Sequence, residues 1–283
     1  MNLERMRNHV FPVIEHDLTF RDSIIYALGL GYGSDPLDPA HLQFLYEKGQ
    51  RQVPSICCVM AYAGFWMSEP QFEIDWVKLL HGEHYYEILS PLPVEGKLTA
   101  KHRVVAVQDK GEGKGAVVTY LKEIFDESGK LLANIEQSNF LRGDGGCGSF
   151  GEPPAERPLV PEREPDVTYE IKTSRRAALI YRLSGDYNPV HADPEVARKG
   201  GGFREPWLAG MCSMGMATRA AITTFCDNDP DRIKSMYVRF KNVAYPGETM
   251  RYEFYRTDDG AQFRVRCVER DVVILDRGYV RFN

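Results

Sequence analysis

The sequence predicts an α+β protein of two similar halves, each combining an apolar helix with an antiparallel sheet. Residues 25–33 recur as residues 180–188, with isoleucine, leucine and two tyrosines at matching places. Segments with strand character then follow in each half in the same order, separated by turn sequences. A chain of 283 residues, 43% of them hydrophobic, has room for two such units.

A short helix is expected to open each half. A helix is expected over residues 21–29, and Thr19 is a good N-cap for it, because its hydroxyl can accept a bond from a free backbone N–H. The matching helix of the second half is expected over residues 175–184, with Thr173 or Ser174 as its cap. Both helices end within the recurring stretch, so the repeat predicts a repeated structural unit.

A longer helix is expected at the centre of each unit. The run from 212 to 226 carries Met, Ala and Ile on nearly all faces, which is typical of a buried helix wrapped by a sheet. Residues 55–67 would be its counterpart in the first half.

The remaining segments have the composition of strands, and the sequences 126–130 and 258–260 are typical of hairpin turns. The expected strands cover residues 85–89, 98–107, 116–125 and 131–141 in the first half, and 235–240, 250–256, 261–269 and 272–282 in the second. A helix with an antiparallel meander, repeated twice, is the pattern of a double hot-dog: two hot-dog units in one chain, each an antiparallel sheet wrapped around a central helix.

Glycine and proline are concentrated between the halves. A glycine-rich run over 143–148 and prolines up to Pro165 predict an extended linker. The expected organisation is an N-terminal unit over 1–143, a linker over 144–165 and a C-terminal unit over 166–283. The alternative is that the glycine run cradles a phosphate, although no helix opens directly after it.

Charge and cysteine content argue against several function classes. The net charge of −5 argues against a nucleic-acid binder, and no apolar run reaches the roughly 18 residues that cross a bilayer. No apolar signal core follows the first residues, so we expect a cytoplasmic protein. The six cysteines show neither a C-x-x-C pair nor zinc-ligand spacing, which predicts buried thiols and no metal site.

The two copies of the repeat differ in chemistry. In the second copy Asp186, Asn188 and His191 follow the helix end, fixed by Gly185 and Pro189. The positions that match the three polar residues hold Gly31, Gly33 and Pro36. A carboxylate and an imidazole that converge at a rigid turn can activate a water molecule and return a proton, while an amide orients the site. Only the second half can carry this chemistry, and we expect the first half to shape a pocket.

Residues 181–191 resemble the signature of the MaoC-type hydratase 2 family, which includes the hydratase 2 unit of peroxisomal multifunctional enzymes. Weaker matches follow the family order at residues 80–83, 91–93, 96–98, 225–229 and 245–249. The resemblance covers the chain from about Phe20 to its end. It implies a double hot-dog and a hydro-lyase, an (R)-specific hydratase that converts trans-2-enoyl-CoA into (3R)-3-hydroxyacyl-CoA and back. It also implies an acyl-CoA partner with no separate cofactor, and a homodimer is expected because fused double hot-dogs often pair again.

The resemblance also implies an oxyanion site at Gly210, where residues 206–211 run into the central helix. A helix N-terminus offers unpaired N–H groups to a developing negative charge. The family usually has a histidine before this glycine, and this chain has Ala209. That departure puts acyl preference, rate or loop geometry in doubt, but leaves the acid/base pair untouched.

Several residues are candidates for substrate contacts. Tyr187 lies inside the motif, and Arg198, Lys199 and Arg204 surround three glycines at 200–202 just beyond it. CoA carries phosphate groups, which basic side chains bind well. The alternative for the three cations is a solvated surface.

Two other clusters allow two interpretations each. His81 and His84 flank residues 82–83 and suggest a metal or acid/base site, but a structural role at a strand edge is favoured. The aromatic residues Phe65, Trp66, Phe72 and Trp76 are expected in the core, with the alternative that some line an acyl tunnel. The rival functions for the whole chain are an acyl-CoA-binding protein with little turnover, suggested by Ala209, and an acyl-CoA thioesterase.

Overall fold

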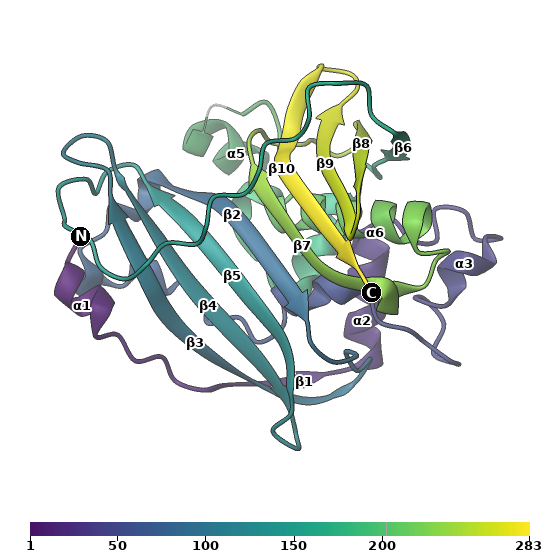
Figure 1. The fold of residues 1–283 in the computed structure, drawn as a ribbon, viewed down its shortest axis with the longest axis horizontal. Helices are drawn as coiled ribbons and strands as arrows, with labels where there is room; N and C mark the ends of the chain where they lie inside the picture. The colour runs from purple at the N-terminus through teal and green to yellow at the C-terminus, as the bar shows by residue number, and fades with distance from the viewer. Residues whose placement is uncertain (202) are drawn as a thin grey trace.

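A single ten-stranded antiparallel sheet forms the body of the protein, with the helices gathered on one of its faces (Figure 1). The computed structural model describes residues 1–201 and 203–283, so Gly202 of the glycine run lies outside the described residues. The strands are β1 (Ile14–Leu18), β2 (Leu79–Ile88), β3 (Gly96–Asp109), β4 (Ala116–Asp126), β5 (Leu131–Leu141), β6 (Val167–Lys172), β7 (Ile233–Phe240), β8 (Thr249–Thr257), β9 (Gly260–Cys267) and β10 (Val272–Phe282). The α-helices are α1 (Leu3–Arg7), α2 (Phe20–Gly29), α3 (Pro39–Leu42), α4 (Ala177–Tyr181), α5 (Pro194–Gly201) and α6 (Gly210–Phe225).

The strand order shows two mirrored halves. It runs β1-β3-β4-β5-β2 through the first half and continues as β7-β10-β9-β8-β6 through the second. The halves meet where β2 pairs with β7, from Glu83 opposite Arg239 to Glu87 opposite Ser235. The double hot-dog expected from the sequence is therefore confirmed, with both units in one sheet.

The two copies of the repeated stretch contact each other where the halves meet. Tyr26 of α2 and Tyr181 of α4 occupy matching positions in the repeat, and their buried rings pack with centroids 5.7 Å apart. Gly29 allows this approach, since a Cβ there would lie 3.1 Å from the Cα of Tyr181. Thr19 caps α2 through a capping box with Asp22, as expected.

The short helix of the second half differs from its prediction. Helix α4 covers only 177–181 and continues as a 3-10 turn over 182–184, and Arg176 is its N-cap without a side-chain cap bond. Of the two expected caps, Thr173 bonds the Glu248 carbonyl and the Gly247 N–H instead, whereas the Ser174 hydroxyl accepts the N–H of Arg176 at 3.1 Å, just before the helix. The Thr173 hydroxyl therefore bonds the chain next to β8 and not the helix start, where the sequence predicted it.

One central helix serves both halves. Helix α6 is buried over residues 212–222, and its Thr218 hydroxyl lies 2.9 Å from the Tyr86 hydroxyl of β2 in the other half. The expected counterpart over 55–67 is wrong, since the described residues there form short 3-10 turns over Pro54–Cys58 and Trp66–Ser68 and no α-helix. Left-handed Ala61 and Gly64 break the first-half segment, which packs against α6 instead of forming a helix of its own.

The predicted strands are present, with β5 and β10 matching their predicted bounds, and both predicted turns connect strands. The edge strands β1 and β6, which are only five and six residues long, were missed; β6 alternates strictly between apolar and polar residues, and this signal could have identified it. Five of the six cysteines are buried, as expected, and Cys147 is half-buried. Within residues 1–201 and 203–283, no helix has both the length and the apolarity required to span a bilayer.

The segment after β5 crosses the outer face of the sheet, opposite the helices, as a strap over residues 151–165 (Figure 1). Arg157 of the strap lies over the rings of Tyr85 and Tyr237, at 5.0 and 5.3 Å. These two tyrosines are direct partners across the β2–β7 pairing. A cation shared by the two rings attaches the strap where the halves meet.

The glycine run before the strap holds an anion of the chain itself. The N–H groups of Gly146 and Gly148 donate to the two carboxylate oxygens of Asp109, each at 2.8 Å. Gly111 adds a third donor, and these backbone bonds lower the pKa of Asp109. The phosphate alternative is therefore wrong in this structure, because a carboxylate already occupies the donors.

We predict that Gly29→Ala destabilises the protein by about 1–3 kcal/mol, because the added Cβ meets the Tyr181 backbone, which cannot move alone. Chemical denaturation would measure the change. Leu28→Ala is the matched control, since Leu28 is exposed on the same helix and its loss should cost well under about 1 kcal/mol. Equal losses for both variants would contradict the close-packed interface between α2 and α4.

Candidate active site

The acid/base stretch lies on a turn that follows α4. Gly185 takes the left-handed conformation, with φ at 112°, and ends the 3-10 turn before it. The Asn188 side chain then caps the next 3-10 turn, Pro189–His191, by accepting a bond from the Val190 N–H at 3.2 Å. Asn188 therefore has a structural role in this turn, and its backbone N–H donates to Asp186 at 3.3 Å.

His191 is held in one tautomer. Its ring is buried, and Nδ1 lies 2.8 Å from the backbone carbonyl of Trp207, so Nδ1 must carry the proton that it donates. The other nitrogen, Nε2, faces the carboxylate of Asp186 at 3.5 Å. In the neutral imidazole Nε2 has a free lone pair. Asp186 and His191 can therefore hold a proton between them and exchange it.

The Asp186 carboxylate is half-buried at the edge of a phenolic and thiol environment. Burial, together with the nearby charge of Asp186, raises the pKa of Tyr62 to about 12. The same two causes raise the pKa of the Cys212 thiol in the first turn of α6. The charge of Asp186 thus acts close to the start of the central helix.

The N-terminus of α6 has unused donors. Ala209 is its N-cap and has no side chain that can bond the first N–H groups, while the Cys212 and Ser213 N–H groups bond the Ala209 carbonyl. Among the described residues, the N–H groups of Gly210 and Met211 have no recorded partner. A Cβ on Gly210 would lie 2.9 Å from the Phe240 ring, so glycine fits best here.

A cavity of about 1050 Å³ reaches this helix start. Trp207, Leu208, Gly210 and Phe240 line it, as do Lys110 and Lys114 of the β3–β4 turn. Asp186, Asn188 and His191 are not among the lining residues, so the cavity meets the predicted site at Gly210 and at Trp207, whose carbonyl bonds His191. The strap covers part of it with residues 153–157. Five further cations contribute to the lining, namely Arg157, Arg239, Lys241, Arg270 and Arg277. Sequence reasoning missed these cations because they come from separate strands and turns.

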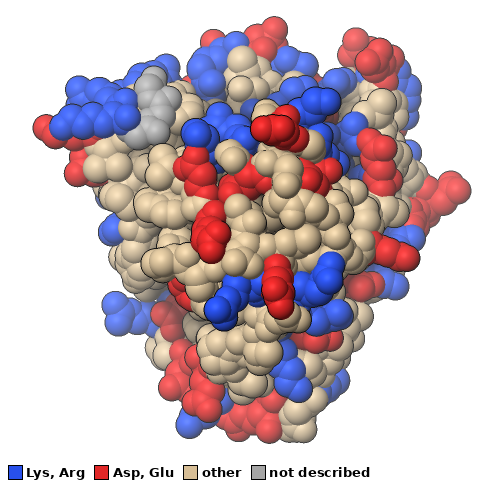
Figure 2. All heavy atoms as spheres, turned by 90° about the vertical axis from the view of Figure 1, so that its left-hand side faces the viewer, with Lys and Arg blue, Asp and Glu red and all other residues tan. Residues whose placement is uncertain are grey.

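Ion pairs neutralise some of the lining cations. Arg277 pairs with Glu156 and Lys241 pairs with Asp276. For Lys110 and Lys114, no acidic partner is recorded in the described part of the chain. Figure 2 shows acidic and basic side chains intermixed over one face of the molecule, so that face lacks the uniform positive charge of a nucleic-acid-binding surface.

The cations predicted to bind substrate lie elsewhere. The Arg198 side chain bonds the Pro194 carbonyl of its own helix, and Lys199 pairs with Glu195 one turn away. Tyr187 is exposed beneath Arg182. Arg204 pairs with Glu248 and Glu205. None of the four predicted residues is among those that line the cavity, so their contact with substrate stays a prediction.

Comparison with known proteins identifies the family. Residues 16–143 match the MFE-2 hydratase 2 N-terminal domain, and residues 157–277 match the MaoC-like domain. The chain is 34% identical to the peroxisomal enoyl-CoA hydratase 2 of Arabidopsis thaliana, covering 99% of this chain and 94% of that protein. It is 37% identical to 3-hydroxyacyl-thioester dehydratase Y of Mycobacterium tuberculosis, over 93% of this chain and 92% of that one.

A solved structure agrees over the whole length. The crystal structure of a MaoC-like dehydratase from Phytophthora capsici superposes with a TM-score of 0.88 at 34% identity, covering 100% of this chain and 99% of that one. This chain belongs to the MaoC-like hydratase 2 family. The peroxisomal multifunctional enzyme type 2 of Drosophila melanogaster is also 34% identical, and the chain spans about half of that relative, 48% of its length.

In this hydratase 2 chain, a cation fills the position that matches the acid/base site in the first half. Arg219 of α6 is buried, bonds the Leu30 carbonyl and lies over the Tyr32 ring. A Cβ on Gly31, the position that matches Asp186, would lie 2.7 Å from the Arg219 guanidinium. The first half therefore has a packed guanidinium where the second half has the carboxylate–imidazole pair.

Of the two alternative clusters, the histidine pair is partly at the cavity, because His81 lines it, and the aromatic cluster is not. His81 Nε2 lies 3.1 Å from His84 Nδ1, and burial lowers the pKa of His81 to about 4, so the pair is neutral at neutral pH. Over residues 1–201 and 203–283, no three His, Cys, Asp or Glu side chains are placed to hold a metal ion. Trp66 and Phe72 are core residues, whereas Phe65 and Trp76 are half exposed, and none of the four lines the cavity.

We predict that the hydratase 2 chain loses stability as the pH falls from about 6.5 to 4. Burial, aided by Lys122, lowers the pKa of His102 from 6.5 to about 4. The unfolded chain therefore binds protons before the folded chain does, which favours unfolding throughout this window. Replacing His102 by Gln should reduce the loss between pH 7 and pH 5 by about 1 kcal/mol, after allowance for the partial exposure of the ring. Urea unfolding at the two pH values would measure it, and an unchanged pH dependence would contradict the prediction.

Proposed function

We propose that this protein hydrates trans-2-enoyl-CoA thioesters to (3R)-3-hydroxyacyl-CoA, and catalyses the reverse dehydration. The main support is the Asp186 carboxylate, which faces Nε2 of His191 near the N-terminus of α6, where backbone N–H groups are unpaired. The printed names of the Arabidopsis and Mycobacterium relatives, an enoyl-CoA hydratase and a 3-hydroxyacyl-thioester dehydratase, support the same reaction type. The R configuration comes from the family resemblance.

The acid/base pair supplies the proton transfers. With Nδ1 protonated, Nε2 and the Asp186 carboxylate are both acceptors, so a water molecule between them can donate one O–H to each. As the water oxygen bonds to C3, the electrons of the C2–C3 double bond move toward the thioester carbonyl. One member of the pair takes the water proton, and the pair returns a proton to C2. The sum is the addition of one water molecule, with Asp186 and His191 restored.

The start of α6 would stabilise the enolate oxygen. The N–H of Gly210, and that of Met211 behind it, point from a helix N-terminus whose cap residue has no competing acceptor side chain. Ala209, where the family usually has histidine, is buried as that cap. The change removes a side chain without filling the donors, which favours catalysis over the rival of an acyl-CoA-binding protein with little turnover.

We predict that Asp186→Asn and His191→Gln each lower kcat by at least about 100-fold, because each variant loses one of the two proton acceptors. The decay of enoyl-thioester absorbance would be followed for short, long, branched and cyclic acyl groups, with an (R)-specific dehydrogenase reading the product. Asp193→Asn is the control, since Asp193 lies two residues beyond His191 and bonds only the N–H groups of 195 and 196. Wild-type release of free CoA without hydration would favour the thioesterase rival.

The cations of the cavity would hold the phosphate-bearing arm of CoA. Lys110 and Lys114 line the same cavity as Gly210 and lack recorded acidic partners in the described chain. An arm that extends from the thioester at Gly210 toward the β3–β4 turn would bring its phosphates to these lysines.

We predict that a double Lys110→Ala and Lys114→Ala variant raises KM for an enoyl-CoA about 10-fold and leaves kcat unchanged, because only ground-state binding is lost. For the N-acetylcysteamine thioester of the same acid, which lacks the nucleotide, its kinetics should equal those of the wild type. The control is the double variant Lys97→Ala and Lys130→Ala. Both lysines are exposed and lie at the end of the β3–β4 pair that is away from the β3–β4 turn. An equal rise in KM for both thioesters would contradict this placement.

Other expectations complete the proposal. We propose that the first half shapes the acyl pocket, that the reaction needs no metal or redox cofactor, that the chain forms a homodimer and that it acts in the cytoplasm. Several relatives carry peroxisomal names, so the test of location compares the cytoplasm with the peroxisome. Activity after chelation, light scattering and imaging of the tagged chain would test these points.

A further inference from the structure

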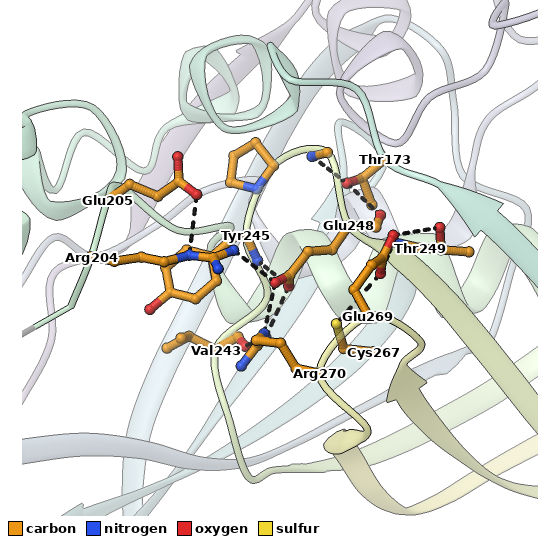
Figure 3. A network of polar contacts seen from close by, with 12 residues as sticks. Thr173, Arg204, Glu205, Val243, Tyr245, Glu248, Thr249, Cys267, Glu269 and Arg270 are labelled. Atoms are coloured by element: carbon orange, nitrogen blue, oxygen red, sulfur yellow. Dashed lines mark hydrogen bonds and ion pairs between the residues drawn. The ribbon is translucent and has the colours of Figure 1, made fainter.

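A buried carboxylate joins three segments next to the candidate site (Figure 3). Glu248, which is 5% exposed, accepts bonds from Arg270 at 2.7 and 2.9 Å and from Arg204 at 2.9 Å. It also accepts the backbone N–H of Tyr245 at 2.9 Å. Both guanidiniums lie over the Tyr245 ring, Arg204 at 4.1 Å and Arg270 at 5.0 Å.

This cluster fixes the chain that leads into α6. Arg204 begins the short segment 204–209, and its side chain ties that end of the segment to Glu248. At the other end, the Leu208 N–H bonds the Ala244 carbonyl at 2.8 Å, one residue before Tyr245. The segment is therefore attached at two points to the loop that Glu248 organises.

The attached segment carries the carbonyl that orients His191. Trp207 lies between the two attachment points, its carbonyl accepts the Nδ1 proton of His191, and its ring packs edge-on against the imidazole at 5.6 Å. Gly210 follows three residues later as the first residue of α6. A shift of the segment would move the imidazole and the open N–H groups together.

We propose that Glu248 is a positioning residue for the acid/base site, which it controls through Arg204 and the Trp207 carbonyl. The inference rests on the proposed hydration, because it assigns a second layer of residues to the same site. The charge of Glu248 is needed as well as its shape, since this one carboxylate faces two guanidiniums. Burial opposes ionisation, but the bonds from Arg270 and the Tyr245 N–H outweigh it, and the pKa of Glu248 lies below its usual range.

The sequence allowed a different role for Arg204, that of a CoA phosphate contact. The two roles give different kinetics. A phosphate contact acts on binding, so its loss raises KM, whereas a positioning contact acts on the geometry of the reacting groups, so its loss lowers kcat. Kinetics of Arg204 variants therefore separate the two roles.

The test is Glu248→Gln in the full chain, with crotonyl-CoA as the probe substrate. We expect kcat to fall about 10- to 100-fold while KM stays within about 3-fold, because a displacement of about 1 Å is enough for such a loss. Glu253→Gln is the matched control: Glu253 also accepts two guanidiniums, Arg264 and Arg266, but its bonds run to β9. Its kcat should equal that of the wild type even if the melting temperatures of both variants fall equally.

A readout without substrate tests the same idea. The ¹⁵N resonances of His191, assigned by comparison with His191→Gln, should report protonated Nδ1 in the wild type and in the Glu253 variant. In Glu248→Gln the Nδ1 signal should move toward the average of the two tautomers. If Glu248→Gln does not fold, Arg204→Gln keeps the Glu248–Arg270 pair and should give the same pattern with a smaller loss.

The outcomes distinguish a failure of the positioning role of Glu248 from a failure of the proposed hydration. Wild-type hydration with unchanged kcat and unchanged His191 resonances in Glu248→Gln would overturn the positioning role and leave the hydratase intact. A rise in KM with normal kcat in Arg204→Gln would overturn the link through Arg204. Absence of hydration by the wild type would overturn the proposed function, and the ¹⁵N spectra would still decide whether Glu248 orients the imidazole.

Discussion

The pairing of β2 with β7 is the constraint on which the molecule depends. It turns two five-stranded sheets into one and sets their helices on one face, where a single central helix, α6, has contacts in both halves. A first half without its own central helix would leave an apolar sheet face uncovered. The seam therefore explains why this half tolerates a 3-10 turn where the second half has four turns of helix.

The site divides its tasks among elements that meet at the start of α6. The turn after α4 supplies the carboxylate and the imidazole, the helix start supplies unpaired N–H groups, and the segment between α5 and α6 supplies the carbonyl that selects the tautomer. The cluster around Glu248 joins this segment to the β7–β8 loop. Local turns thus hold the carboxylate and the imidazole. Long-range ion pairs hold the segment whose carbonyl orients the imidazole.

Much of the fold and the centre of the site follow from the sequence, because their signals are local or repeated. Strand composition and turn sequences identified eight strands, an apolar run identified α6, and the spacing of Asp186 and His191 around a proline turn brought them together as expected. Three of the failures share one cause, which is tertiary competition. Thr173 bonds the β8 side instead of capping α4, Asp109 fills the glycine nest, and Glu248 takes Arg204. Nothing in the local sequence encodes these partners, which lie 37 or more positions away.

The strap over the outer face also constrains the order of assembly. Arg157 needs one ring from each half, Tyr85 and Tyr237, and these rings become neighbours only when β2 and β7 have paired. The strap can therefore close fully only after the halves have docked, although it precedes the second half in the chain. The contact of Arg157 with both rings therefore belongs to the completed pairing of the halves and is lost whenever β2 and β7 separate.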